Sequence, residues 1–81
     1  MDEDDALRDA PDLRDLLSHY AALDRNTWHP RRGEGGSPRA VARLHGELIA
    51  HGWIEQNTGS LSPGSYRATR AGVKALERIE D

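Results

Sequence analysis

The chain has 81 residues, no cysteine, a net charge of −3 and 36% hydrophobic residues. This length fits one domain, and the lack of cysteine excludes disulfides and thiolate metal sites. No apolar run approaches the roughly 20 residues of a membrane-spanning helix. Residues 2–5 are all acidic, whereas a secretory signal begins with basic residues and continues with apolar ones, so we expect a cytoplasmic protein.

The charge is unevenly distributed along the chain. Residues 1–24 contain eight acids and two arginines, a net charge of −6, whereas residues 25–81 contain nine bases and six acids, a net charge of +3. Two explanations of this asymmetry are open. It can mark an acidic arm that precedes a mildly basic body, or it can reflect solubility and the favourable placement of acids near helix N-termini. We expect residues 1–10 to form a flexible acidic N-terminal arm with one loose turn at 6–9. Residues 11–81 form the single expected domain.

The first strong periodicity predicts an amphipathic helix over residues 12–23. Its apolar residues recur at helical spacing: Leu13, Leu16, Leu17, Tyr20 and Leu23. Residues 25–36 contain one proline and three glycines, which predict a loop. Residues 27–29 should be extended, because the residue before Pro30 is biased away from helical geometry. Trp28 would then cover the core.

A second helix is predicted over Ser37–His51. Ser37 can cap its free amides, the next proline suits the first helical position, and Gly52 fits the left-handed stop. At 100° per residue, the inner face carries Val41, Leu44 and Leu48, and the opposite face carries Arg39, Arg43 and Gly46.

The remaining residues predict an antiparallel hairpin and a third helix. The strands are Trp53–Gln56 and Tyr66–Ala68, joined by a Gly/Ser-rich tip around Leu61. Thr69 can cap the last helix, which runs from residue 70 to about 79. The expected fold is a small α+β domain with three helices and a two-stranded antiparallel β-wing, in the order α-α-β-β-α.

Two motifs carry a resemblance to a known family. L-x3-L-I-x2-G-W-I-E spans residues 44–55, and Y-R-A-T-x2-G-x3-L spans residues 66–76. Together they resemble the second half of winged-helix transcriptional regulators of the MarR and PadR type, over residues 37–79. Such domains normally have a helix directly before the recognition helix, where this chain has residues 25–36. Either that helix is reduced to a turn near residues 30–33, or the helix at 12–23 takes its place.

The resemblance implies that the helix at 37–51 enters the major groove of DNA with its N-terminus first. Arg39 and Arg43, four residues apart, project from one face and can bind phosphate or guanine, and the small Ala42 and Gly46 allow close approach. No lysine or arginine lies between Trp53 and Tyr66. The expected DNA-binding residues are Arg31, Arg32, Ser37, Arg39, Ala42, Arg43, Gly46 and Arg67.

The sequence predicts no cofactor, metal site or enzymatic activity. His45 and His51 are six residues apart, and residues 45–47 (His-Gly-Glu) do not form a His-Glu-x-x-His zinc motif. We expect all four histidines to be exposed or half-buried. The glycines at 33–36 predict a flexible loop, because no Walker or dinucleotide-binding spacing accompanies them.

Two functions remain open at this point. The first is a DNA-binding transcriptional regulator that acts on double-stranded DNA and dimerises through its terminal helices. The alternative is a winged-helix protein–protein interaction module without DNA binding, whose partner would contact the Trp28 loop or the acidic N-terminus. Neither function requires a membrane.

Overall fold

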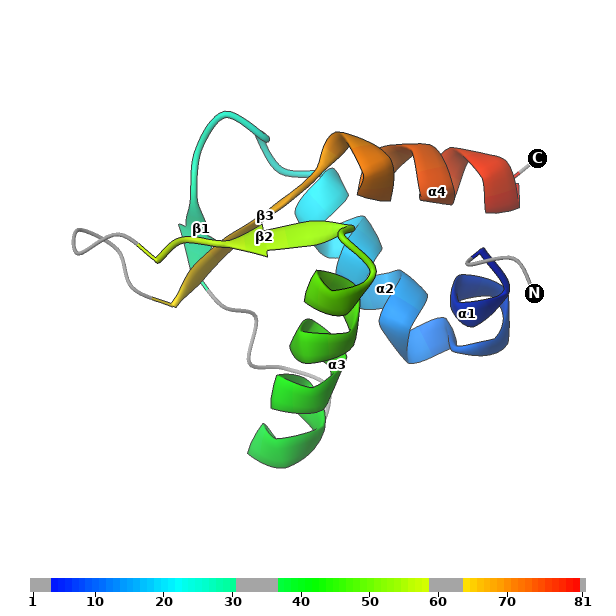
Figure 1. The fold of residues 1–81 in the computed structure, drawn as a ribbon, viewed down its shortest axis with the longest axis horizontal. Coiled ribbons are helices and arrows are strands. Elements are labelled where there is room, and N and C mark those ends of the chain that lie inside the picture. The colour runs from blue at the N-terminus through cyan, green and yellow to red at the C-terminus, as the bar shows by residue number, and fades with distance from the viewer. Residues whose placement is uncertain (1–3, 31–36, 59–63, 81) are drawn as a thin grey trace.

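The computed structural model describes residues 4–30, 37–58 and 64–80 as a small α+β domain. In these residues, four helices and a three-stranded antiparallel sheet follow the order α-α-β-α-β-β-α (Figure 1). The elements are α1 (Asp4–Asp9), α2 (Pro11–Ala21), β1 (His29–Pro30), α3 (Pro38–Ala50), β2 (Ile54–Gln56), β3 (Ser65–Ala68) and α4 (Arg70–Glu80).

The N-terminal region differs from the flexible arm that we expected over residues 1–10. Residues 4–9 form α1, which packs against α2 and α4, and the side chain of Leu7 is 0% exposed. One buried leucine in a six-residue helix leaves no periodic pattern in the sequence. The packing of α1 against α2 and α4 explains why this helix forms. In Figure 1, α1 lies close to α4, which brings the two ends of the chain to the same side of the domain.

The sheet has one strand more than expected. The central strand β3 pairs with β2 on one side, as the predicted hairpin requires, and with β1 on the other. The pairing of β1 joins His29 to Tyr66 and Pro30 to Ser65, so the strand begins two residues later and ends one residue later than the extended segment predicted over residues 27–29. Two residues are too short to show a strand period, and proline is tolerated there because β1 is an edge strand.

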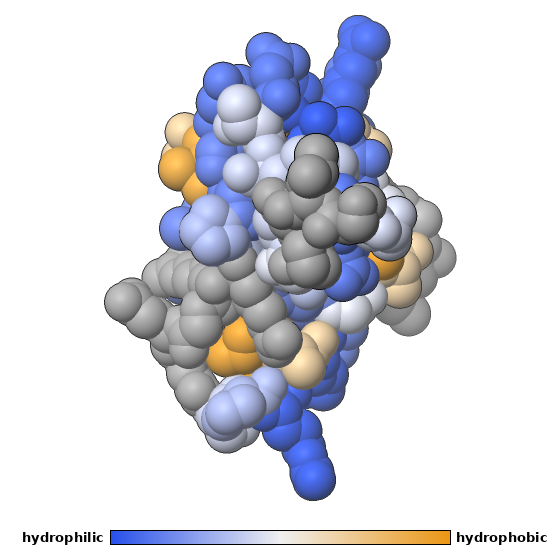
Figure 2. Space-filling model, turned by 90° about the vertical axis from the view of Figure 1, so that its left-hand side faces the viewer, coloured by the Kyte–Doolittle hydropathy of each residue, from blue (hydrophilic) through white to orange (hydrophobic). Residues whose placement is uncertain are grey.

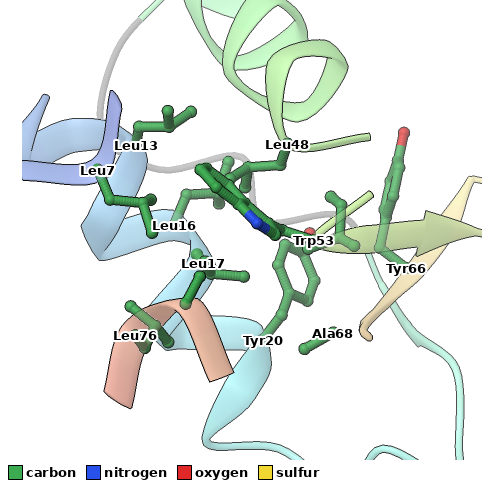
Figure 3. Packing of buried hydrophobic residues seen from close by; sticks show 12 residues of the cluster. Leu7, Leu13, Leu16, Leu17, Tyr20, Leu48, Trp53, Tyr66, Ala68 and Leu76 are labelled. Carbon is green, nitrogen blue, oxygen red and sulfur yellow. The ribbon is translucent and has the colours of Figure 1, made fainter. Parts of the chain in front are cut away.

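One face of the sheet packs on α2 and α3 and forms the core. Ile54 pairs with Ala68, and both are buried, whereas the next pair, Glu55 and Arg67, points to the other face because side chains alternate along a strand. Trp53 is 1% exposed, as expected, and Figure 3 shows its ring between Leu48 and Tyr20.

Two small residues fix the position of α4 against the rest of the core. The Thr69 hydroxyl accepts a hydrogen bond from the Gly72 amide (3.1 Å) and donates one to the Gly52 carbonyl (2.6 Å). The predicted cap on the last helix is therefore confirmed. Gly72 lies against the backbone of Trp53, where a β-carbon would come within 2.2 Å of the carbonyl oxygen.

Candidate nucleic-acid interface

Helix α3 begins and ends where the sequence predicts. The Ser37 hydroxyl accepts a hydrogen bond from the Ala40 amide (3.2 Å), and Pro38 occupies the first turn. The helix ends at Ala50, and Gly52 adopts a φ of 77°, a backbone conformation that residues with a β-carbon rarely adopt. These end signals are local, so they hold whatever α3 packs against.

The inner face of α3 fixes which side chains point outward. Val41 and Leu48 are buried, Leu44 is half-buried, and His45 is buried as well. The opposite face is exposed and brings together four of the predicted residues, with Ser37 at its start: Arg39, Ala42, Arg43 and Gly46. A β-carbon at Gly46 would have no neighbour within 4 Å, so nothing in the described fold covers this part of the helix.

One of the two outward arginines has an acidic neighbour. The Arg43 guanidinium lies 3.6 Å from the carboxylate of Glu47, and the two side chains are 68% and 45% exposed. An ion pair this exposed contributes little to stability. It partly neutralises the charge of α3, an effect that the four-residue spacing of these two residues could have predicted.

His45 is the clearest correction to the sequence-based prediction. It is 2% exposed rather than half-buried, with Nδ1 2.8 Å from the Val41 carbonyl oxygen and Nε2 2.8 Å from the Tyr20 hydroxyl. Because a carbonyl can only accept, Nδ1 carries a hydrogen. The Tyr66 ring lies 4.7 Å from the imidazole, so His45 joins α3 to both α2 and β3.

Arg67 does not join the arginines of α3. It lies on the sheet face that points away from the core, donates a 2.5 Å hydrogen bond to Glu55 and lies over the Trp28 ring at 4.2 Å from its centroid. Its side chain is 30% exposed. Two neighbours therefore hold this guanidinium before any ligand arrives.

Trp28 is not the core lid that the sequence indicated. It is half-buried and lies outside the core cluster, on the same face as Arg67. A tryptophan ring under an arginine is a cation–π contact, which stabilises by about 0.5–1 kcal/mol at an exposed position. Arg31 and Arg32, which we expected to bind DNA, lie outside the described residues, as do Leu61 and most of the segment that could hold a reduced second helix.

A hollow of about 530 Å³ opens beside this cation–π pair on the outer face of the sheet. The turn after α2, the outer face of the sheet and the start of α4 form its walls. Its lining residues are Asp24, Arg25, Asn26, Glu55, Arg67, Ala68, Thr69 and Arg70.

The surface near the sheet is largely polar. Figure 2 shows hydrophobic side chains only in small separate patches on that side of the molecule. Among the described residues, Ile49 is the one large hydrophobic side chain that is exposed, at 38%. The same residues contain no group of three or more acidic or histidine side chains that could hold a metal, and none of their helices is long and apolar enough to cross a bilayer.

In comparisons with known proteins, no family model matches this chain, and neither a curated protein nor a solved structure matches it.

Proposed function

We propose that this protein is a winged-helix transcriptional regulator that places α3 in the major groove of double-stranded DNA. The observation that carries the proposal is the outer face of α3, where Arg39 and Arg43 flank the small Ala42 and Gly46 and no element of the described residues covers them. Small residues let the helix backbone approach the groove, while the guanidinium groups reach phosphates or guanine edges. The paired strands after α3 and the capped α4 support the winged-helix order that the motifs imply.

The charge of α3 favours modest and salt-sensitive affinity. Glu47 lies next to Arg43, and the whole chain has a net charge of −3. Arg67, held by Glu55 and Trp28, contributes less than we expected, so Arg39 and Arg43 carry most of the phosphate contact among the described residues. We expect non-specific duplex binding with a Kd of about 1–100 µM at physiological salt and tighter binding at low salt.

A fluorescence anisotropy titration against a labelled random-sequence duplex tests the proposal. Arg39→Ala combined with Arg43→Ala should weaken binding and reduce the slope of log K against log salt by about one for each phosphate that the protein no longer neutralises. The matched control is Arg14→Ala combined with Lys74→Ala, which removes the same charge from exposed positions on α2 and α4. Equal weakening of DNA binding in the two double variants would show a general charge effect and reject α3 as the recognition helix.

The alternative is an interaction module without DNA binding, and the position of Trp28 outside the core favours it. A half-buried tryptophan outside the core is the kind of side chain that anchors protein contacts. No retardation of random duplex in a low-salt gel shift at tens of micromolar protein would favour this second function.

A further inference from the structure

We propose that the hollow on the outer face of the sheet binds the oxyanion group of a small ligand, a phosphate or a carboxylate, between Arg25 and Arg70. The site is separate from α3, and the proposal does not depend on DNA binding. It rests on which charges around the hollow already have partners and which do not.

The hollow is lined by three arginines and two acids, and both acids have partners. Asp24 accepts a hydrogen bond from the Asn26 amide at 2.9 Å, which holds its carboxylate within its own turn. Glu55 accepts the 2.5 Å hydrogen bond from Arg67. With three arginines against these two acids, the lining of the hollow keeps a net charge of +1.

The three arginines of the hollow differ in whether they already have a partner. Arg67 is held by Glu55 and by the Trp28 ring, whereas Arg25 and Arg70 have no ion pair within the part of the chain that the structure describes. Both are exposed and come from different segments, the turn after α2 and the first residue of α4. Two unmatched guanidinium groups beside one hollow favour an anion with several acceptor oxygens, which arginine binds in a bidentate manner.

The fold also holds the walls of the hollow in place. His29 Nε2 lies 2.6 Å from the Asp24 carbonyl oxygen, and this contact ties the turn to β1. On the opposite wall, the Thr69 amide donates to the Trp53 carbonyl at 2.9 Å. The Thr69 hydroxyl already accepts a hydrogen bond from the Gly72 amide, so that amide is not available to the proposed ligand.

The position of the hollow separates this site from the DNA-binding surface. Glu55 and Arg67 point away from the sheet face on which α2 and α3 pack. A ligand in the hollow and a duplex on α3 would therefore contact different faces of the domain.

A two-dimensional ¹H–¹⁵N NMR titration of the full chain tests the proposal, with inorganic phosphate and acetate as separate probes at constant ionic strength. We expect saturable shifts confined to the Asn26, Thr69 and Arg70 amides and the Arg25 and Arg70 side-chain Nε–H signals. Arg25→Gln combined with Arg70→Gln should weaken phosphate binding by about tenfold or more, because charged hydrogen bonds are removed. Arg14→Gln combined with Lys74→Gln, which removes the same charge elsewhere, should leave the affinity unchanged.

The two probes distinguish the ligand sources. Saturation by phosphate alone supports a phosphorylated ligand, and saturation by both probes supports a site that also accepts carboxylates. The proposal is overturned if shifts stay linear with both anions, or if chloride reproduces them. Equal weakening in the two double variants would overturn it too. Spectra of each variant without added anion show whether the fold is retained, and Arg25→Lys provides a milder variant if the double substitution unfolds the domain.

Discussion

The hydroxyl of Tyr20 lies 2.8 Å from Nε2 of His45, in the buried interior between α2 and α3. This contact joins residues 25 positions apart and helps to fix the rotation of α3 about its own axis, because it holds one side of α3 against α2. The hydrogen bond of His45 to the Val41 carbonyl lies within α3 and orients the imidazole. The outward direction of Arg39 and Arg43 follows from that rotation. The buried Tyr20–His45 pair therefore helps to orient the exposed arginines of the proposed interface.

Tyr20→Phe should lower the free energy of unfolding by about 1–3 kcal/mol, because Nε2 of the buried imidazole loses this partner. Urea denaturation followed by circular dichroism measures the change. The matched control is Tyr66→Phe, which removes the same hydroxyl from the other tyrosine that contacts His45 through its ring. Equal destabilisation in the two variants would show that the Tyr20–His45 contact has no special weight.

Substitution of two helical glycines by alanine should have opposite effects. Gly72→Ala places a β-carbon 2.2 Å from the Trp53 carbonyl oxygen and 3.1 Å from a Leu17 methyl, so α4 must move away from β2. We expect the free energy of unfolding to fall by about 1–3 kcal/mol. Gly46→Ala meets nothing within 4 Å and should stabilise α3 by about 0.5–1 kcal/mol. Thermal unfolding compares them, and a stable Gly72→Ala protein would contradict the close packing of α4 on Trp53.

The two tryptophans should differ strongly in their effect on stability. Trp53 is 1% exposed at the centre of the core, and Trp53→Ala should cost about 3–5 kcal/mol, enough to unfold a small domain. Trp28 contacts the Arg67 guanidinium outside the core, and Trp28→Ala should cost about 1 kcal/mol. Far-ultraviolet circular dichroism at 25 °C distinguishes these outcomes. An unfolded Trp28→Ala protein would mean that this ring acts as a core lid after all.

Removal of the acid beside Arg43 should strengthen DNA binding. Glu47→Gln releases the guanidinium from its partner and removes one negative charge from the proposed interface, so the affinity for random duplex should rise about twofold at low salt. The free energy of unfolding should change by less than about 0.5 kcal/mol, because the pair is exposed. Glu77→Gln on α4 is the control for net charge. The interface proposal fails here if Glu77→Gln raises the affinity equally.

Part of the fold could not be predicted because it depends on contacts between distant residues. Leu7 shows no helical pattern of its own, and only α2 and α4 make its burial possible. The two residues of β1 pair with β3 across more than thirty positions, with no period to mark them. The sequence around His45 does not distinguish it from a surface histidine, and one of the partners that satisfy its buried ring, Tyr20, lies 25 residues away.

The candidate surfaces show the same division. The helical spacing of residues 39, 42, 43 and 46 was enough to place them on one exposed face, because 3.6 residues per turn is a local property. Arg67 looked equally available in the sequence, yet pairing with β2 puts Glu55 beside it and β1 brings Trp28 beneath it. The hollow between Arg25 and Arg70 joins two segments that no sequence pattern connects.

By itself, the sequence determined where α3 and α4 begin, where α3 ends and that β2 and β3 pair as an antiparallel hairpin. A serine or threonine cap, a glycine with positive φ and alternation along a strand act within a few residues. Only the tertiary structure decided that α1 folds onto the core, that His45 is buried and that Arg67 is held on the outer face. Those outcomes depend on desolvation and pairing between side chains far apart in the chain, and such partners become neighbours only when the domain has packed.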